Sequence, residues 1–517
     1  MHISLIYTDR DPWALGMRGL SSILKERGYH TRLIFMGSDG AKYPRGTLER
    51  ARGLVKDSGL IGVSCLSRGS EKAKQVIQYL KPLQKPIIWG GLHATLNPDE
   101  CAQYADMACV GEGEDVIVEL ASRVSEHRRW NDISNLVYKN NGSLVRNPLR
   151  PLIADLDQLP LVDFTCEDEF HLQDGKTFLR PSHLAEVTES YEIVFNGSRG
   201  CGFHCTYCCN AKLKQIYSKV GRYVRKMSIS RYIEYTKKLK QHFPQAKYFY
   251  LIDEDFLARS VDELKEFSER FPKEVGMPFE CCGSPLQISD EKMDLLVKAG
   301  LWRIRMGIES GSERTKREIY KRPMSNAAVR RAVEVISRHA QVIPYYFLLI
   351  TNPYEEEEDL LETLRVMSSL PGSFFVQAFN LVFFPGSALY QRALNDGLIT
   401  GKEDSGYELD FRGGLRYKGH SWKYKNLYLN ALLFMMEGKS TRLRIGSLPR
   451  FMIPILTSPN VINFNKRFLI ITKLMIESKV LTLSLRSKGA SVLRYLIGDP
   501  RAIYNIRDFI EGRLLRG

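Results

Sequence analysis

Short apolar runs alternate with amphipathic stretches along the first quarter of the chain. The apolar runs predict strands at residues 2–7, 30–36, 60–65, 86–89 and 108–110. Apolar residues at helical spacing predict helices at residues 15–27, 70–80 and 115–125. Strands separated by helices in this way are typical of βαβ units with parallel strands. We therefore expect an α/β domain with a doubly wound parallel sheet over residues 1–126.

A second alternation of strands and helices begins near residue 192. Its six expected strands are at residues 192–196, 248–252, 279–282, 303–306, 343–349 and 377–383. Six strands interleaved with helices predict a partial (β/α)6 barrel, whose functional face lies at the carboxyl ends of the strands. We assign this barrel to residues 189–400. Residues 127–188, which contain the turn signal Asn140-Asn141-Gly142 and several prolines, are expected to form a hairpin and a linker.

The pattern becomes mainly helical after Phe411, and the charge changes at the same point. The chain has a formal net charge of +15. The segment from Arg412 to Gly517 holds 20 Lys and Arg against 5 Asp and Glu, so the rest of the chain is neutral. We expect residues 401–517 to be a basic, mainly helical region. Its segment 464–494 could lie on an anionic membrane, or it could cover the barrel and turn a solvated basic face outward.

The composition is that of a globular protein, with 44% hydrophobic and 26% charged residues in 517. No apolar run reaches the length of a membrane span, and the first residues begin a strand in place of a secretion signal. We therefore expect a cytoplasmic protein. In a reducing compartment, its ten cysteines are expected to be thiols or metal ligands.

Three cysteines follow the first strand of the second half, in the sequence Gly200-Cys201-Gly202-Phe203-His204-Cys205-Thr206-Tyr207-Cys208. Thiolates at this spacing on a tight loop suit a cuboidal iron–sulfur cluster and leave one iron without a protein ligand. A structural zinc site is the alternative, but it usually takes four ligands from two pairs, and no second pair with zinc-like spacing follows. We do not expect Cys209 to reach the same cluster, because it is adjacent to Cys208.

This segment resembles the radical S-adenosylmethionine (SAM) superfamily, over about residues 192–396. The resemblance implies a [4Fe–4S] cluster on Cys201, Cys205 and Cys208, with SAM bound to the open iron. Three stretches carry the rest of the resemblance: Tyr207 before the third cysteine, Ile252–Asp255 after the next strand, and Met306–Glu313, which matches the family's GIESGSE stretch. The SAM contacts implied are Tyr207, Asp253, Glu254, Gly307, Glu309 and Ser310.

The N-terminal unit resembles the cobalamin-binding domain that is fused to many radical SAM enzymes. The resemblance rests on the stretches 88–95 and Gly111-Glu112-Gly113-Glu114. It implies cobalamin contacts from Ser64, Leu66, Ser67, Gly90, Gly91, His93, Ala94, Gly111, Glu112 and Gly113. The D-x-H-x-x-G signature of enzymes that ligate cobalt with histidine is absent, so we expect no protein histidine on the cobalt. The alternative is a flavodoxin-like domain that only packs.

Together the two resemblances imply reductive cleavage of SAM to a 5′-deoxyadenosyl radical, hydrogen abstraction, and methyl transfer from cobalamin to an unactivated carbon. The motifs leave two alternatives open. One is cobalamin-dependent oxidative cyclisation or rearrangement. The other is a cluster-bearing redox protein without enzymatic activity, which would need a fourth protein ligand to the cluster.

The expected partners follow from the same chemistry. We expect a small-molecule or lipid-like substrate and an electron donor such as flavodoxin or ferredoxin. Residues 412–517 are expected to contact an anionic membrane, at its inner face. Nucleic acid is not expected, because the only feature that favours it is the basic tail. The sequence names no further catalytic side chain.

Overall fold

The computed structural model describes residues 1–40, 42–188, 191–322, 324–401 and 426–468. The chain forms two compact units. The first consists of Met1–Gly307, Lys316–Tyr345 and Val382–Asp410, and the second of Ile308–Thr315, Tyr346–Leu381 and Phe411–Gly517. None of the described helices is long and apolar enough to cross a membrane.

The N-terminal sheet belongs to the first unit and has nine strands in the order β7-β6-β5-β4-β3-β1-β2-β8-β9. Its parallel centre consists of β2 (His30–Phe35), β1 (His2–Tyr7), β3 (Leu60–Ser64), β4 (Ile87–Gly90) and β5 (Met107–Cys109). The helices between these strands are α1 (Leu15–Glu26), α2 (Arg45–Val55), α3 (Ser70–Leu80), α4 (Gly91–Leu96), α5 (Pro98–Tyr104) and α6 (Glu114–Ser125).

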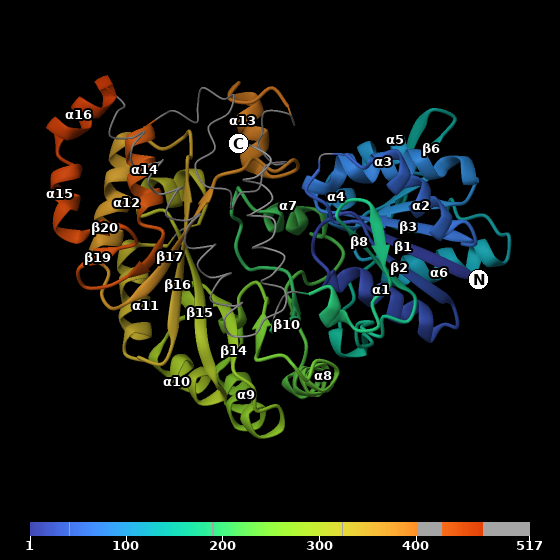
Figure 1. Cartoon of the computed structure of the whole chain (residues 1–517), viewed down its shortest axis with the longest axis horizontal. Coiled ribbons are helices and arrows are strands. Elements are labelled where there is room, and N and C mark those ends of the chain that lie inside the picture. The colour runs from blue at the N-terminus through green and yellow to red at the C-terminus, as the bar shows by residue number, and fades with distance from the viewer. Residues whose placement is uncertain (41, 189–190, 323, 402–425, 469–517) are drawn as a thin grey trace, which may run out of the picture. The chain divides into compact units, whose positions relative to one another are not determined.

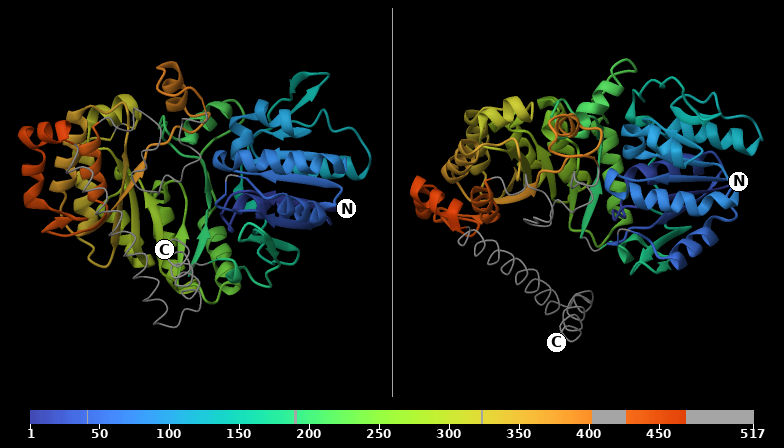
Figure 2. Two further views of the ribbon diagram at one scale, coloured as in Figure 1. Left: turned by 45° about the horizontal axis from the view of Figure 1, so that its top comes forward. Right: turned by 90° about the horizontal axis from the view of Figure 1, so that it is seen from above.

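Both faces of this sheet are covered by helices, as the blue part of Figures 1 and 2 shows. One core contains Ile6 and residues of α2, α3 and α5, and the other contains Leu5 and residues of α1 and α6. Neighbouring strand residues point to opposite faces, so Leu5 and Ile6 pack in different cores. This explains why the strands read as continuous apolar runs, and it confirms the doubly wound parallel sheet.

The segment expected to be a hairpin and linker contributes strands to both edges of this sheet. The predicted hairpin is β6 (Leu136–Asn140) and β7 (Ser143–Arg146), and β6 pairs antiparallel with β5. At the other edge, β8 (Glu169–Gln173) pairs with β2, and β9 (Thr177–Leu179) pairs with β8. The linker interpretation is therefore wrong for residues 169–179.

The second sheet has the order β10-β13-β14-β15-β16-β17-β18-β19-β20. Its first six strands match those predicted from the sequence: β10 (Glu192–Phe195), β13 (Tyr248–Leu251), β14 (Phe279–Gly283), β15 (Leu301–Glu309), β16 (Ile343–Ile350) and β17 (Phe374–Asn380). The pairs β10–β13, β13–β14 and β14–β15 are parallel. Within the described residues the strand order has two ends, so this sheet is an open one.

Helices alternate with these strands. They are α7 (Cys209–Ile216), α8 (Ile229–His242), α9 (Val261–Glu274), α10 (Asp290–Ala299), α11 (Asn326–Ser337), α12 (Glu357–Ser369) and α13 (Ala388–Asn395). Phe279 of β14 packs against Phe267 and Phe271 of α9 at ring-centroid distances of 5.5 Å. Helix α9 begins with a capping box, in which Ser260 and Glu263 exchange hydrogen bonds. A separate ribbon of β11 (Ser198–Arg199) and β12 (Arg225–Lys226) encloses the cysteine motif in sequence.

The C-terminal region mixes helices and short strands where the structure describes it. Residues 426–468 form α14 (Leu427–Met435), β18 (Gly438–Ser440), β19 (Arg444–Ile445), β20 (Leu448–Pro449), a 3₁₀ turn (Arg450–Met452), α15 (Ile453–Leu456) and α16 (Pro459–Phe468). The three strands extend the second sheet antiparallel from β17. The amphipathic segment expected at 464–494 lies outside the described residues from position 469 onward.

Candidate functional site

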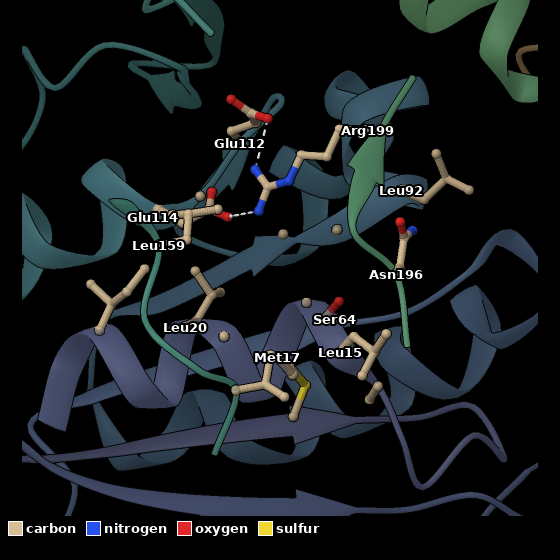
Figure 3. Close-up of a pocket in the computed structure, with 18 of the residues that line it drawn as sticks. Leu15, Met17, Leu20, Ser64, Leu92, Glu112, Glu114, Leu159, Asn196 and Arg199 are labelled. Carbon is tan, nitrogen blue, oxygen red and sulfur yellow. Dashed lines mark hydrogen bonds and ion pairs between the residues drawn. The ribbon is translucent and has the colours of Figure 1, made fainter. Parts of the chain in front are cut away.

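A cavity of about 600 Å³ opens in the first unit at the carboxyl ends of β3, β4 and β5 (Figure 3). Parallel α/β sheets bind ligands at this edge. Seven of the ten residues that the sequence assigned to cobalamin line the cavity: Ser64, Leu66, Gly90, Gly91, Gly111, Glu112 and Gly113. Ser67, His93 and Ala94 are buried and do not line it.

The backbone of the glycine loops forms part of the cavity wall. Gly91 has φ +85°, and a Cβ atom there would lie 2.4 Å from the Ser64 hydroxyl oxygen. Any larger residue would be strained in its backbone and would collide with β3. The glycine therefore lets the loop after β4 lie directly against the end of β3.

No histidine is found among the described residues that line the cavity. His93 is fully buried, with Nδ1 3.2 Å from the Ser67 hydroxyl and Nε2 3.7 Å from a Glu100 carboxylate oxygen. These contacts hold its ring inside the N-terminal domain. The remaining wall is largely apolar, and Figure 3 shows Leu15, Met17 and Leu20 of α1 facing the cavity.

The same cavity is also lined by the beginning of the second α/β domain. Residues 194–199, at the end of β10 and in β11, contribute to its wall, as do Tyr217, Met227, Tyr235 and Ile252. Cys201 follows this wall segment after one residue. A ligand in the cavity would therefore touch both the glycine loops and the strand that leads into the cysteine motif.

A group of ion pairs joins the glycine loop 111–114 to the ribbon β11–β12. Glu112 accepts hydrogen bonds from Arg199 Nη1 at 2.7 Å, Arg225 Nη1 at 3.1 Å and the Ile153 backbone N–H at 2.8 Å. Arg199 also pairs with Glu114, the first residue of α6 (Figure 3). Burial acts to raise the pKa of Glu112, but the bonds from Arg225 and Arg199 outweigh it and lower that pKa. Arg199 and Arg225 were not predicted as site residues.

The cysteine loop is fixed at several points by its own unit. Gly200 has φ +85°, and a Cβ there would lie 2.4 Å from the Tyr223 carbonyl oxygen. Thr206 donates its backbone N–H to the Tyr320 carbonyl at 2.9 Å and accepts from the Leu389 N–H at 2.9 Å. Cys208 caps α7 and accepts a hydrogen bond from the Asn210 N–H at 3.5 Å. The loop is therefore preorganised before any cofactor binds.

The surroundings of the three thiols differ. A hydrogen bond from Cys209 lowers the pKa of Cys208, whereas burial raises the pKa of Cys201 to about 11. Burial also raises the pKa of Cys205, although Arg322 opposes it with Nη1 at 3.7 Å from the sulfur. In the described part of the chain, no three His, Cys, Asp or Glu side chains are arranged to hold one metal ion. A cuboidal cluster does not need such an arrangement, because each thiolate binds a different iron.

The acidic stretch after β13 lies in the same unit. Asp253 is buried, and its Oδ2 accepts hydrogen bonds from the Tyr232 hydroxyl at 3.1 Å and the Gly197 N–H at 3.4 Å. Among the described atoms, its Oδ1 has no hydrogen-bond partner. Glu254 is exposed at the surface, and desolvation by the protein around it raises the pKa of its carboxyl group. Burial raises the pKa of Asp255 to about 6.

The remaining SAM candidates are divided between the units. Tyr207 packs edge-on against Tyr320, and the Gly307 carbonyl accepts from Arg322 Nη2 at 3.3 Å, all within the first unit. Glu309 and Ser310 belong to the second unit, where the Ser310 hydroxyl donates to Glu355 at 2.8 Å. Arg322 and Glu355 were not predicted as site residues.

The sequence matches two family models, one on each α/β domain. The B12 binding domain matches residues 3–121, and the Radical SAM superfamily matches residues 195–367.

Two named relatives and one solved structure are each similar to about three quarters of this chain. An uncharacterized methyltransferase of Pyrococcus horikoshii is 25% identical over 74% of this chain and 79% of its own length. The cytidylyl-2-hydroxyethylphosphonate methyltransferase of Streptomyces wedmorensis is 22% identical over 78% of this chain and 82% of its own length. The solved structure of the radical SAM methyltransferase TsrM from Kitasatospora setae has a similar fold, with a TM-score of 0.61 and 16% identity over 76% of each chain.

Both domains, their order and the spacing of their motifs agree with the resemblance found in the sequence. The chain therefore belongs to the radical SAM enzymes that carry a cobalamin-binding domain.

Proposed function

We propose that this enzyme methylates an unactivated carbon of a small molecule with the help of a [4Fe–4S] cluster, SAM and cobalamin. The observation that carries the proposal is the cavity of the first unit, whose wall comes both from the cobalamin-type glycine loops and from residues 194–199 before the cluster cysteines. Three similar proteins named methyltransferases cover 74–78% of this chain, whereas two named cyclases cover 67% and 54% of it, which favours methylation over cyclisation.

When bound, the cluster and SAM supply one-electron cleavage that starts hydrogen abstraction, and cobalamin supplies a transferable methyl group. The chain's own residues have to position these groups and exclude water. The thiolates of Cys201, Cys205 and Cys208 would hold the cluster. The thiol of Cys208 is already shifted toward its thiolate form by its hydrogen bonds, which fits a ligand.

The residues proposed for SAM offer complementary chemistry. Asp253 Oδ1 is a buried acceptor without a partner among the described atoms, and a buried carboxylate oxygen fits an ammonium donor such as the amino group of methionine. Tyr207 offers an aromatic ring for the adenine, and Glu254 offers an exposed carboxylate beside Asp253. Gly307, Glu309 and Ser310 are proposed to border the adenosine.

The proposed cobalamin contacts are those of the cavity wall. The glycines at 90, 91, 111 and 113 bring backbone to the surface, and Ser64 and Leu66 end β3 beside them. Because no histidine is found among the described lining residues, the cavity wall would offer no imidazole to a bound corrinoid. Ser67, His93 and Ala94 would support the loop from behind, because they are buried outside the cavity wall.

The other proposals concern partners and location. We place the enzyme in the cytoplasm, at or near the inner face of the membrane, with a flavodoxin or ferredoxin as electron donor. The substrate is proposed to be a small or lipid-like molecule. The basic composition of residues 412–517 is the support for the membrane contact.

The test is an anaerobic reaction with SAM that carries a trideuterated methyl group. The reconstituted enzyme, with and without cobalamin, is incubated with a small-molecule and lipid extract and a chemical reductant, and the products are examined by mass spectrometry. We expect 5′-deoxyadenosine and a product that has gained one labelled methyl group, the latter only with cobalamin. The Cys205→Ala variant should give neither. If 5′-deoxyadenosine forms but no labelled methyl group appears in any product, the enzyme is not a methyltransferase, and cyclisation or rearrangement takes its place.

A further inference from the structure

Large exposed apolar side chains gather in a short part of the second unit. Leu443 is 81% exposed, Phe451 74%, Ile455 58% and Met452 36%. A soluble protein buries side chains of this kind where it can, so a local group of them marks a surface that meets something else. We call these four residues the apolar patch.

Hydrogen bonds from Arg450 hold the turns that carry Leu443 and Phe451 in place. Leu443 lies at the turn between β18 and β19, and Phe451 and Met452 lie in the 3₁₀ turn that follows β20. Arg450 joins the two turns, because its backbone N–H donates to the Leu443 carbonyl at 2.9 Å and its Nε donates to the Thr441 carbonyl at 3.0 Å. Its Nη2 also bonds to the Leu370 carbonyl at 3.2 Å, at the end of α12. Leu443 and Phe451 are therefore presented next to one another.

Exposed basic residues lie near Leu443, at one end of the patch. Arg442 and Arg444 flank Leu443 and are exposed, and Lys439 on β18 is exposed as well. From Gly438 to Asn465 the sequence contains no Asp or Glu. The exposed apolar residues of this segment therefore lie near basic side chains, and the segment contains no acidic side chain that could neutralise their charge.

We infer that the apolar patch is a docking surface for an anionic lipid bilayer. A site that binds at a membrane surface needs apolar side chains that insert below the lipid headgroups. It also needs basic side chains that remain among the headgroup phosphates. A leucine at the tip of a turn with arginine on each side supplies both within three residues. A protein partner would need an acidic rim matched to the arginines, whereas an anionic membrane satisfies them in any orientation around the patch. This inference rests on the membrane contact proposed above for residues 412–517 and gives it a location, but it does not depend on the proposed methyl transfer.

The first experiment measures co-sedimentation of the full-length holoenzyme with vesicles of phosphatidylglycerol and of phosphatidylcholine. We expect binding to phosphatidylglycerol that weakens as salt rises. The double variant Leu443→Ser/Phe451→Ser should bind about tenfold more weakly, because membrane affinity scales with the apolar area inserted. Arg442→Gln and Arg444→Gln should each weaken binding about fivefold at low salt. Residues 469–517 stay in place in every variant, so a loss is assigned to the patch.

The matched control is Leu286→Ser. Leu286 is 49% exposed but lies in the first unit, far along the sequence from the patch. This variant should bind vesicles like the wild type. If wild type does not bind phosphatidylglycerol, or if the double variant binds as tightly as wild type, the inference is overturned.

A second experiment places a reporter at the tip of the turn. In the Leu443→Trp variant, the added fluorescence relative to wild type should be that of a solvated indole and should shift to the blue with phosphatidylglycerol vesicles. An emission that is blue without vesicles and unchanged by them means that another segment of this chain or a second copy covers the turn. That result also overturns the inference. Circular dichroism of each variant checks that the fold is intact.

Discussion

The cysteine loop, which we also call the cluster loop, contains four cysteines, of which we propose three as cluster ligands and the fourth, Cys209, as a neighbour without this role. Cys209 is the first residue of α7, and its thiol donates a hydrogen bond to Cys208. Replacement of Cys201, Cys205 or Cys208 by Ala should abolish the cluster, because two thiolates do not hold the cuboid. Cys209→Ala should keep iron and sulfide contents near those of wild type. Chemical iron and sulfide analysis after anaerobic reconstitution checks this, and loss of the cluster in Cys209→Ala would show that the ligand assignment is wrong.

The contacts of Glu112 show what a sequence motif alone does not predict about a residue. The sequence assigned it to cobalamin, but in the structure its carboxylate is engaged by Arg199, Arg225 and the Ile153 N–H. Its arginine partners lie 87 and 113 residues further along the chain. A local sequence pattern does not reveal an ion pair between residues that far apart in the chain. The cysteines could be predicted because their ligand spacing is local.

The ion pairs of Glu112 should position the cluster loop. Glu112→Gln leaves Arg199 and the nearly buried Arg225 with one fewer carboxylate, and we expect a loss of about 2 kcal/mol in unfolding free energy. The SAM-induced change in the electron paramagnetic resonance spectrum of the cluster should also be altered, both by Glu112→Gln and by Arg199→Gln. The double variant should be affected by less than the sum of the two single variants, because both single variants remove the Glu112–Arg199 ion pair.

The control for this prediction is Glu119→Gln. Glu119 lies on α6, just after the loop that holds Glu112, and is 31% exposed. Its partners Arg123 and Arg150 do not belong to the ribbon β11–β12. Its loss should cost less than about 1 kcal/mol and leave the cluster spectrum unchanged. An unaltered cluster spectrum in Glu112→Gln, with weaker corrinoid binding alone, would return Glu112 to the role of a cofactor contact.

Among the secondary-structure elements, the central strands of both sheets were predicted from the sequence, whereas helix α2 and strand β8 were not. The strands of both parallel sheets are buried apolar runs, which pattern reading detects. Helix α2 was missed because its sequence contains two glycines and buries only Thr47, Leu48, Ala51 and Val55. Strand β8 was missed because its first residue, Glu169, is a buried charge. Its carboxylate binds Arg18, 151 residues away, so the local pattern reads as polar.

In the second unit, Glu355 joins the loop after β16 to the end of β15 through Ser310. Burial raises the pKa of Glu355 to about 8, far above the ordinary value of about 4.3 for Glu. The folded state therefore binds this proton more tightly than the unfolded state does. The resulting stability is fully present below about pH 4 and is lost as pH rises to about 8.

Glu355→Gln keeps an acceptor for Ser310 but cannot ionise. We expect its melting temperature to change less between pH 5 and pH 8 than that of wild type, so the variant gains relative stability as pH rises. Thermal unfolding of both proteins across this range, under anaerobic conditions without SAM, is the measurement. Parallel curves for the two proteins would mean that Glu355 is ionised in the folded state.

At the scale of the whole molecule, the sequence predicted the order of the domains and their cofactors. It did not predict that residues 136–179 complete the first sheet at both of its edges, because edge pairing is decided by contacts with strands far away in sequence. It also did not predict that the cobalamin-type loops and the start of the second α/β domain line one cavity. A ligand in this cavity would contact residues of both α/β domains.

The proposed function requires that one unit hold a corrinoid without a histidine ligand next to a SAM-binding cluster. Electron paramagnetic resonance of the anaerobically reconstituted enzyme tests it without knowledge of the substrate. We expect a Co(II) signal without nitrogen splitting from a protein imidazole, and a reduced-cluster signal in the same sample that changes when SAM is added. Failure to retain a corrinoid, a nitrogen splitting from a protein histidine, or a cluster signal indifferent to SAM would contradict it.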